Sequence, residues 1–389
     1  MSDKQFDLVI YGASGFTGRL VAEYLQQRYG DDPSLSWAMA GRNAEKLQQV
    51  CELIGVPESV PILVADGDDV ESLKALAAKT KAIITTVGPY QLYGDKLVEV
   101  CAKTGTDYLD LCGEPAWMRH MIDAHESTAK ASGARIVFSS GFDSIPSDLG
   151  VWKLQQHCIA ETGKPSSHIL GRVRKMQGTF SGGTAASAKA TLKAAMQDPA
   201  VMALMRDPYS LIPGFTSVKQ LSGNKPMYDE IAGSWVTPFV MAAINVRNVF
   251  RSNALMGFPY GEDFRYDEML MTGPGEKGEQ IAKSLAEKGM MTDKDGPKPG
   301  EGPSKEEREA GFYDILFIAE TDEGLIKLAV TGDRDPGYGS TSKMLAEAGI
   351  CLVKECAETP AGIWTPAAAM GQRLFDRMVS NAGLTFERE

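Results

Sequence analysis

The chain has 389 residues, more than one hydrophobic core usually organises, and this length suits two domains of roughly 150–200 residues each. Hydrophobic residues make up 43% and charged residues 23% of the sequence, which is the composition of a globular protein without collagen-like or disordered bias. The net charge of −11 argues against nucleic-acid binding, because neutralising phosphates requires a basic face.

The sequence contains no run of about 18 apolar residues, and its first residues lack the apolar stretch of a secretory leader. The six cysteines are scattered and form no Cys-x-x-Cys pair, and histidine is scarce. We therefore expect a cytoplasmic protein with reduced cysteines, no transmembrane segment and no metal site. Peripheral contact with a membrane stays open.

Strand and helix patterns alternate over the first 140 residues. Strands are predicted over residues 6–11, 36–40, 61–65, 82–87, 108–111 and 134–139, and helices over 18–29, 70–78, 96–104 and 116–132, with another around Leu47 and Val50. Repeated strand–helix–strand units with short connections indicate a parallel, doubly wound sheet with right-handed crossovers. The fold class is therefore α/β, with a Rossmann domain over residues 1–145.

The pattern changes after residue 141. The sequence predicts a long strand over 168–179, an Ala-rich helix over 184–205, a partly buried amphipathic helix over 233–255, a surface loop over 292–309, and a hairpin of 312–321 with 325–331. Long strands with few crossover helices indicate an α+β domain over residues 146–340 that serves substrate binding or dimerisation. Residues 341–389 are predicted to form C-terminal helices, over 342–354 and 366–381.

A glycine-rich segment follows the first predicted strand. Its three glycines are spaced as Gly-x-x-Gly-x-x-Gly where the strand gives way to a helix, and Arg19 at the end rules out a P-loop. The first glycine permits a tight turn, the second lets a pyrophosphate approach, and the third lets helix and strand pack closely. We predict a dinucleotide site that comprises Gly12, Ser14, Gly15, Phe16, Thr17 and Gly18. A flexible glycine turn is the alternative.

The end of the second predicted strand distinguishes the two nicotinamide cofactors. NAD-binding domains commonly carry an acidic residue there for the ribose 2′-hydroxyl, whereas residues 35–43 contain no acid and include Arg42. A guanidinium suits a 2′-phosphate, and Lys46 one turn later adds a second positive charge. We therefore predict NADP(H), with a solvated surface arginine as the alternative.

Further candidates follow the next two strands. Asp66 could accept a hydrogen bond from the adenine amino group, or it could cap a helix. Val87, Gly88 and Pro89 lie where the nicotinamide ribose passes in such sheets, and Tyr90 could stack on or hydrogen-bond near the reacting carbons. An ordinary β-turn is the alternative for residues 87–90.

Two carboxylates end the later strands of the predicted sheet. Glu114 and Asp143 both lie where the fold offers a cleft to a substrate, so both are candidate acids. Helix capping or hydrogen bonding at the domain junction is an equally open interpretation. The Tyr-x-x-x-Lys pair that short-chain dehydrogenases need occurs at no tyrosine of the chain.

With these motifs, the chain resembles the saccharopine dehydrogenase-like oxidoreductases, which include the bacterial trans-acting enoyl reductases. The segments that carry the resemblance are 11–18, 40–42, 87–90, 108–114, 141–150, 332–338 and 365–369. The resemblance implies a Rossmann domain joined to an α+β domain, C-terminal helices that pack back onto the first domain, and reduction by a nicotinamide cofactor. It does not identify the substrate.

We therefore expect NADPH-dependent reduction of a C=C bond in an enoyl or similar acyl substrate, with Tyr90 or Asp143 as the proton donor or enolate stabiliser. One alternative is an imine or amino-acid oxidoreductase of saccharopine type. Such a substrate would need several convergent cations, for which Arg172, Arg174, Arg247 and Arg334 are candidates. A lipid-associated NADP-binding protein without turnover is a further alternative, and a homodimer stays open.

Overall fold

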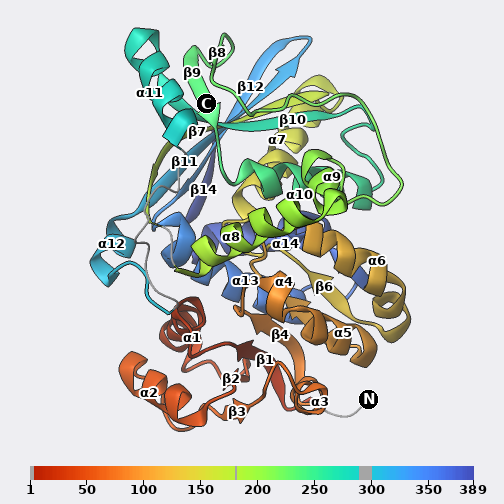
Figure 1. The fold of residues 1–389 in the computed structure, drawn as a ribbon, viewed down its shortest axis with the longest axis vertical. Helices are drawn as coiled ribbons and strands as arrows, with labels where there is room; N and C mark the ends of the chain where they lie inside the picture. Colours follow the sequence, from red (N-terminus) through yellow and green to blue (C-terminus); the bar gives the residue numbers. More distant parts are fainter. Residues whose placement is uncertain (1–3, 180–181, 289–299) are drawn as a thin grey trace.

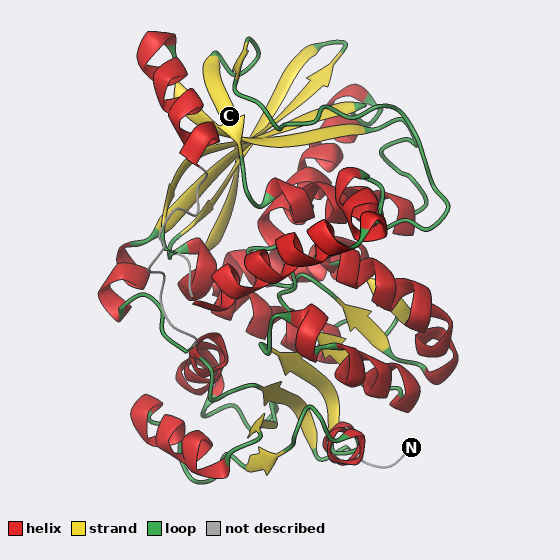
Figure 2. Ribbon diagram, viewed as in Figure 1, coloured by secondary structure: helices red, strands yellow, loops and turns green. Residues whose placement is uncertain are grey.

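Two seven-stranded sheets lie one above the other in the computed structural model, which describes residues 4–179, 182–288 and 300–389 (Figure 2). The first sheet contains β1 (Phe6–Tyr11), β2 (Trp37–Gly41), β3 (Ile62–Val64), β4 (Thr80–Thr85), β5 (Asp107–Leu109), β6 (Arg135–Val137) and β13 (Gly362–Trp364). The strand order is β13-β6-β5-β4-β1-β2-β3, and every pairing is parallel. Apart from β13 this is the Rossmann order, so the predicted doubly wound sheet is confirmed.

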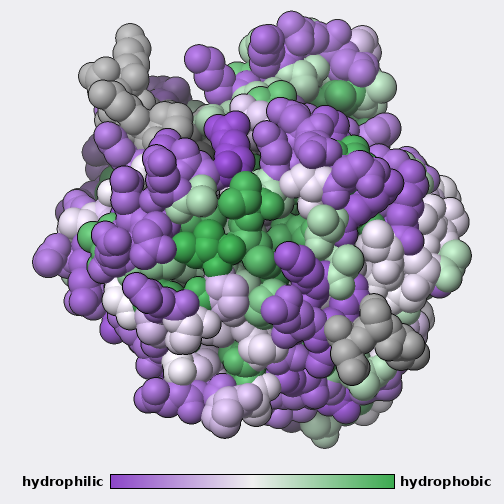
Figure 3. Space-filling model, turned by 90° about the horizontal axis from the view of Figure 1, so that it is seen from below, coloured by the Kyte–Doolittle hydropathy of each residue, from purple (hydrophilic) through white to green (hydrophobic). Residues whose placement is uncertain are grey.

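Helices cover both faces of the first sheet (Figure 1). They are α1 (Phe16–Tyr29), α2 (Ala44–Ile54), α3 (Val70–Ala77), the single turn α4 (Tyr90–Tyr93), α5 (Asp95–Thr104) and α6 (Pro115–Ser132). All six residues of β1 are buried, as expected for a central strand covered on two sides. One edge of the sheet is β3, where Val64 is exposed. An apolar area bordered by hydrophilic residues lies on the lower surface of the molecule (Figure 3).

The second sheet is mixed. Its strands are β7 (His168–Gln177), β8 (Met227–Asp229), β9 (Ser234–Pro238), β10 (Arg265–Gly273), β11 (Phe312–Thr321), β12 (Gly324–Gly332) and β14 (Leu384–Arg388). They are arranged as β14-β12-β11-β7-β10-β9-β8, and only β7 and β10 pair in parallel. The helix α7 (Ile145–Thr162) packs on this sheet, and a β-carbon on Gly150 would lie 2.5 Å from the Phe317 ring. The expected α+β region is confirmed.

Three predicted elements of this region differ from the structure. The helix predicted over 233–255 begins only with α10 (Ala242–Leu255), because the preceding β9 pairs with β10. The helix predicted over 184–205 is divided into α8 (Gly182–Gln197) and α9 (Pro199–Arg206) at Asp198, which caps α9. The predicted loop 292–309 lies partly outside the described residues, and its last part is wrong because α12 (Lys305–Ala310) begins with a capping box of Ser304 and Glu307.

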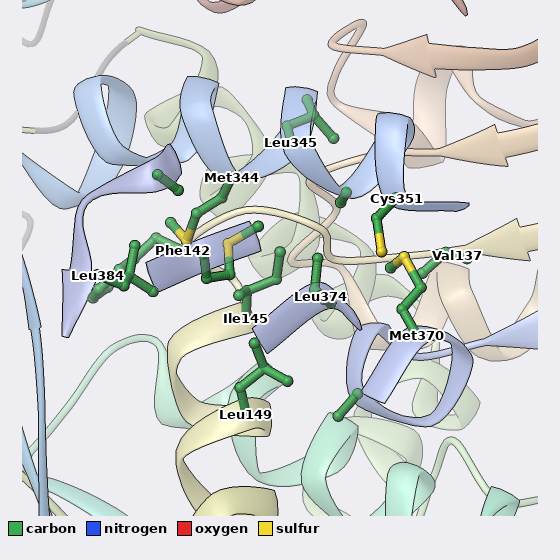
Figure 4. Packing of buried hydrophobic residues seen from close by; sticks show 14 of the residues in the cluster. Val137, Phe142, Ile145, Leu149, Met344, Leu345, Cys351, Met370, Leu374 and Leu384 are labelled. Atoms are coloured by element: carbon green, nitrogen blue, oxygen red, sulfur yellow. The ribbon is translucent and has the colours of Figure 1, made fainter. Parts of the chain in front are cut away.

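The C-terminal segment returns to the first sheet, as the resemblance implied. The helix α13 (Thr341–Lys354) packs on α1, β1 and β4, and β13 extends the sheet beside β6. After β13, α14 (Pro366–Arg377) and the short turn η2 (Met378–Ala382) pack on α13 and lead to β14 in the second sheet. Apolar side chains of α13 and α14, such as Met344 and Leu374, lie close to Ile145 of α7 (Figure 4). One continuous core therefore joins the two sheets.

Among the described helices, none combines the length and the hydrophobicity needed to cross a bilayer.

A buried carboxylate fastens this C-terminal return. Glu347 of α13 accepts hydrogen bonds from the hydroxyls of Tyr24 (2.7 Å) and Tyr29 (2.6 Å) on α1, and from Nε of Arg377 (2.8 Å) on α14. Asn381 donates to it as well, at 3.2 Å. The side chain of Glu347 is 0% exposed, so these hydrogen-bond partners, rather than water, stabilise its negative charge.

We expect Glu347→Ala to lower the free energy of unfolding by about 3–5 kcal/mol, because it leaves Arg377 without its buried partner. Glu355→Ala is the matched control, since Glu355 also pairs with Arg377 but is 36% exposed, and we expect a loss of about 1 kcal/mol or less. Urea denaturation measures both values. Equal losses in the two variants would contradict the role given to Glu347.

Candidate active site

The glycine-rich segment forms a tight loop between β1 and α1. Gly12 has φ +87°, and a β-carbon there would lie 2.6 Å from Cγ2 of Val87. A β-carbon on Gly18 would lie 2.3 Å from the carbonyl oxygen of Gly12 and 2.7 Å from Oγ1 of Thr86. Both positions therefore require glycine, Gly12 for the turn and Gly18 for the close packing of α1 on the loop.

The N-terminus of α1 offers a site for an anion. Gly15 is the N-cap residue, no side chain caps the helix, and its first turn contains no acidic residue. The first backbone N–H groups of a helix lack partners within the helix, and its dipole favours negative charge there. Ser14 is exposed, and Gly15 and Thr17 are partly exposed. This end of α1 therefore fits the pyrophosphate of a dinucleotide.

The ring of Phe16 is engaged elsewhere. It lies 5.2 Å from the Tyr338 ring, and the guanidinium carbons of Arg19 and Arg308 lie 5.3 and 5.7 Å from its centre. A β-carbon on Gly302 would lie 2.5 Å from the same ring. Phe16 thus contributes its backbone to the start of α1, while its side chain joins the first domain to the segment before α12.

Of three further predicted cofactor residues, Arg42 and Asp66 follow the carboxyl ends of β2 and β3, and Lys46 lies in the first turn of α2. Arg42 and Lys46 are exposed, and within the described part of the chain neither side chain forms a hydrogen bond or ion pair. Asp66 is exposed too, and its carboxylate accepts a hydrogen bond from the backbone N–H of Asp68 at 3.0 Å. Burial and the charge of Asp66 raise the pKa of Tyr11 to about 12, against the opposing charge of Arg42. Arg42 and Asp66 therefore face the same tyrosine at this edge of the sheet.

A cavity of about 430 Å³ lies across the carboxyl ends of the first sheet, where open α/β sheets bind ligands. Thr17, Gly88, Tyr90 and Asp143 of the predicted site line it. The opposite wall comes from the second sheet, from α8, from the segment before α10, and from η1 (Pro336–Ser340) with the start of α13. Its residues are Met176, Gly178, Thr179, Ser187, Ala188, Val240, Met241, Pro336, Gly337, Tyr338 and Thr341. The cavity therefore lies between the dinucleotide loop and the second sheet.

Tyr90 forms a fixed part of the cavity wall. Its hydroxyl donates to the carbonyl oxygen of Thr85 at 3.2 Å and accepts from the backbone N–H of Leu111 at 3.4 Å. Its ring lies 5.5 Å from Trp117, and the side chain is buried. Burial raises the pKa of Tyr90 well above its usual value. This hydroxyl is committed to the backbone, which leaves the aromatic face as its contribution to the site.

The carboxyl group of Asp143, unlike the Tyr90 hydroxyl, is not fully occupied by hydrogen bonds to the described residues around it. The side chain is partly exposed at the cavity, but its Oδ1 atom is buried without a hydrogen-bond partner among the described residues. Burial, with the nearby charge of Glu268 as a second cause, raises the pKa of Asp143 to about 7. A carboxyl group in this state can hold a proton near neutral pH and donate it.

Glu268 on β10 is the buried neighbour that influences Asp143. It accepts hydrogen bonds from Oγ of Ser147 at 2.7 Å and from Nδ2 of Asn245 at 2.9 Å. Burial also raises the pKa of Glu268. The sequence did not predict β10, and no motif marked this glutamate.

The other candidate acid and the nominated cations have structural roles. Glu114 accepts from the backbone N–H groups of Tyr90 and Gln91, both at 2.9 Å, and so holds α4 in place. None of the four arginines lines the cavity. Arg172 pairs with Asp229 and Asp267, Arg174 with Asp314 and Glu389, and Arg334 with Asp333, while Arg247 binds Ser210 and backbone carbonyls.

The second wall of the cavity was not predicted from the sequence. Tyr338 and Thr341 belong to the segment that follows β12, which carried part of the family resemblance but no chemical motif. The hydroxyl of Thr341 accepts a hydrogen bond from the backbone N–H of Phe142 at 3.0 Å, so this segment is joined to the loop that bears Asp143. Only the return of the C-terminal segment brings these residues to the site.

A Rossmann sheet, a glycine loop at an uncapped helix and a cavity across the strand ends define a dinucleotide-binding protein. Residues 8–137 match the saccharopine dehydrogenase NADP binding domain. A Mycobacterium tuberculosis protein provisionally named a trans-acting enoyl reductase is 40% identical, over 99% of this chain and 97% of its own. A trans-acting enoyl reductase from Mycobacterium leprae is 35% identical, in an alignment that covers 97% of this chain and 96% of the relative.

The chain belongs to the saccharopine dehydrogenase-like oxidoreductases, as its motifs suggested. Its N-terminal domain binds NADP(H). The structure of saccharopine dehydrogenase (L-Glu forming) from Saccharomyces cerevisiae has the same fold, with a TM-score of 0.53 over 99% of both chains at 11% identity.

We expect Gly18→Ala to weaken NADPH binding about 10-fold or more and to lower stability by about 1–3 kcal/mol, because the added methyl group forces α1 away from Gly12. Gly41→Ala is the control, since its β-carbon would lie 3.7 Å from the nearest side chains, an ordinary contact. Fluorescence titration with NADPH and urea denaturation measure the two effects. An unchanged affinity in Gly18→Ala would contradict the close packing.

Proposed function

We propose that the protein is an NADPH-dependent reductase of a C=C bond in an enoyl or similar lipid-type acyl substrate. The relatives named as trans-acting enoyl reductases support this activity, since they align over almost the whole chain. The structural observation that carries the proposal is the chemistry of the cavity. Among the described residues that line it, none is lysine, arginine or histidine, and Asp143 is the one acid.

This lining favours an acyl substrate over an amino-acid one. A substrate with several carboxylates requires convergent cations, and the four candidate arginines are engaged away from the cavity. Apolar and small side chains form most of the walls, including Leu111, Phe142 and Met241. The saccharopine-type alternative therefore has less support from the site than the enoyl reductase.

We propose that Arg42 and Lys46 bind the 2′-phosphate of NADPH, for which their free and exposed cationic groups are suited. The backbone at Gly12, Ser14, Gly15, Phe16, Thr17 and Gly18 would hold the pyrophosphate, Asp66 the adenine end, and Val87, Gly88 and Pro89 the nicotinamide end. Bound NADPH supplies a hydride. The residues of the chain position the cofactor and exclude water from the cavity.

We assign the proton donor to Asp143 rather than Tyr90. The Tyr90 hydroxyl is occupied by the backbone around it, whereas Oδ1 of Asp143 has no partner among the described residues. A protonated Asp143 can donate to the substrate carbon or hydrogen-bond to the developing enolate oxygen. Burial of the Asp143 carboxyl group is the main cause that favours its protonated form, and the nearby Glu268 is the second.

We further propose a cytoplasmic protein that acts on a small-molecule or acyl substrate and contacts lipid surfaces peripherally. The six cysteines are buried as free thiols, which suits a reducing compartment. The proposed division is a cofactor domain over 1–145, a substrate domain over 146–340 and a returning segment over 341–389. A homodimer stays a prediction.

Arg42→Ala should weaken NADPH binding about 10- to 100-fold and leave NADH binding nearly unchanged, because only NADPH carries the 2′-phosphate. Arg28→Ala, which removes a positive charge at the opposite end of α1, is the control and should change neither affinity. Isothermal titration calorimetry with both cofactors measures the difference. An equal loss for NADPH and NADH would refute the assignment.

The rate of reduction should fall as the pH rises through about 7, because Asp143 donates only in its protonated form, which predominates below its raised pKa. Asp143→Asn should lower kcat about 10²- to 10⁴-fold and remove this pH transition. Tyr90→Phe keeps the ring and should retain the transition. NADPH oxidation followed at 340 nm with an enoyl thioester gives these profiles.

Loss of the transition in Tyr90→Phe, but not in Asp143→Asn, would reverse the assignment. Tight NADPH binding without oxidation on any enoyl, imine or carbonyl substrate would instead support a binding protein without turnover.

A further inference from the structure

One face of α8 combines exposed apolar and basic side chains. Lys189, Leu192, Lys193 and Met196 are spaced three and four residues apart, so they share one stripe of the helix, and all four are exposed. The side chains of Leu192 and Met196 are 54% and 73% exposed. The helix runs across the molecule between the two sheets, in the front of the view (Figure 1).

This stripe lies on a helix that also lines the active-site cavity. Ser187 and Ala188, one turn before Leu192, line the cavity itself. The neighbouring residue Thr191 accepts a hydrogen bond from Nε2 of Gln91 on α4, at 3.0 Å. The helix α4 therefore lies beside α8, and it also begins at the cavity with Tyr90.

The short helix α4 adds further exposed apolar side chains. Leu92 is 62% exposed and Tyr93 is 58% exposed. We call Leu92, Tyr93, Lys189, Leu192, Lys193 and Met196 the α4–α8 face. Isolated exposed apolar residues are ordinary on a protein surface, but a group of them beside a cavity marks a binding surface.

The charge of this face differs from that of the whole chain. The 16 residues of α8 include two lysines and no aspartate or glutamate, whereas the chain carries 51 acidic against 40 basic residues. Lysines that flank an apolar stripe are typical of helices that lie in the interface of an anionic bilayer. Tyrosine is enriched at the level of the lipid headgroups, so the exposed Tyr93 also suits a bilayer surface.

We propose that the α4–α8 face docks on the surface of an anionic lipid bilayer and places the mouth of the cavity against it. This proposal rests on the proposed function for its purpose: a docked protein could take a long acyl substrate from the bilayer into the cavity. A bilayer suits this face better than a second copy of the chain. A stable protein interface usually buries about 20–30 residues on each side, many more than these six.

The test is flotation of the full-length protein with vesicles. We expect binding to vesicles of phosphatidylcholine with about 30% phosphatidylserine, and weaker binding to phosphatidylcholine alone, because the lysines add about a factor of five each on an anionic surface. Leu192→Gln with Met196→Gln should lower the partition coefficient about 10-fold or more, since glutamine keeps the helix but removes the apolar contact.

Leu53→Gln is the matched control, because Leu53 is a leucine on α2 that is 67% exposed and does not line the cavity. It should leave flotation unchanged. Lys189→Gln with Lys193→Gln should abolish the preference for anionic vesicles while retaining residual binding to neutral ones. Absence of wild-type flotation, or an equal loss in Leu53→Gln, would overturn the proposal.

Two further readouts separate the proposal from its alternatives. If the Leu192/Met196 double variant converts an oligomer to a monomer in size-exclusion chromatography, the face is a contact between copies of the chain and the docking proposal is wrong. NADPH oxidation with a short, water-soluble enoyl thioester, measured without vesicles, tests the proposed reaction by itself. The double variant should retain that short-chain activity, and flotation would stand even if the reaction failed.

Discussion

The active-site cavity depends on the return of the C-terminal segment to the first sheet. Glu347 on α13 is fully buried and binds two tyrosines of α1 and an arginine of α14, so helices from both ends of the chain share one charge. Because α13 starts directly after η1, fixing α13 on α1 also fixes Pro336, Tyr338 and Thr341 in the cavity wall.

The same return explains why the two sheets act as one unit. Thr341 accepts a hydrogen bond from Phe142, the residue before Asp143, and Tyr338 packs on Phe16 at the start of α1. Asp148 of α7 accepts hydrogen bonds from Ser252 of α10 and from the backbone of Ala367 at the start of α14. The Phe16–Tyr338 contact joins the first domain to the second, and the contacts of Thr341 and Ala367 join the returning segment to Phe142 and to α7. The position of the reactive carboxyl group is therefore set from both sides of the cleft.

The sequence was informative where local chemistry determines the structure. The glycine loop, the alternating strands and helices, and the basic residue after β2 follow local rules of backbone conformation and charge, and the fold class was predicted from them. Strand β9 was missed because its residues continue an apolar pattern into α10, and only pairing with β10 makes them extended. Glu268 and Thr341 were missed for a related reason. Their roles arise from contacts between segments far apart in the chain, which no local pattern encodes.

The two ends of the cleft differ in the charge that they offer, and this difference determines the chemistry in the proposed reaction. In the proposed site, the exposed Arg42 and Lys46 would offer cations to the cofactor, whereas the described lining of the cavity offers no cation for a developing negative charge. An ionised carboxylate there would repel an enolate. A carboxyl group kept protonated by burial can donate a hydrogen bond to it instead. In the proposed reaction, the raised pKa of Asp143 would allow an apolar cavity, suited to acyl chains, to stabilise charge at the reacting atoms.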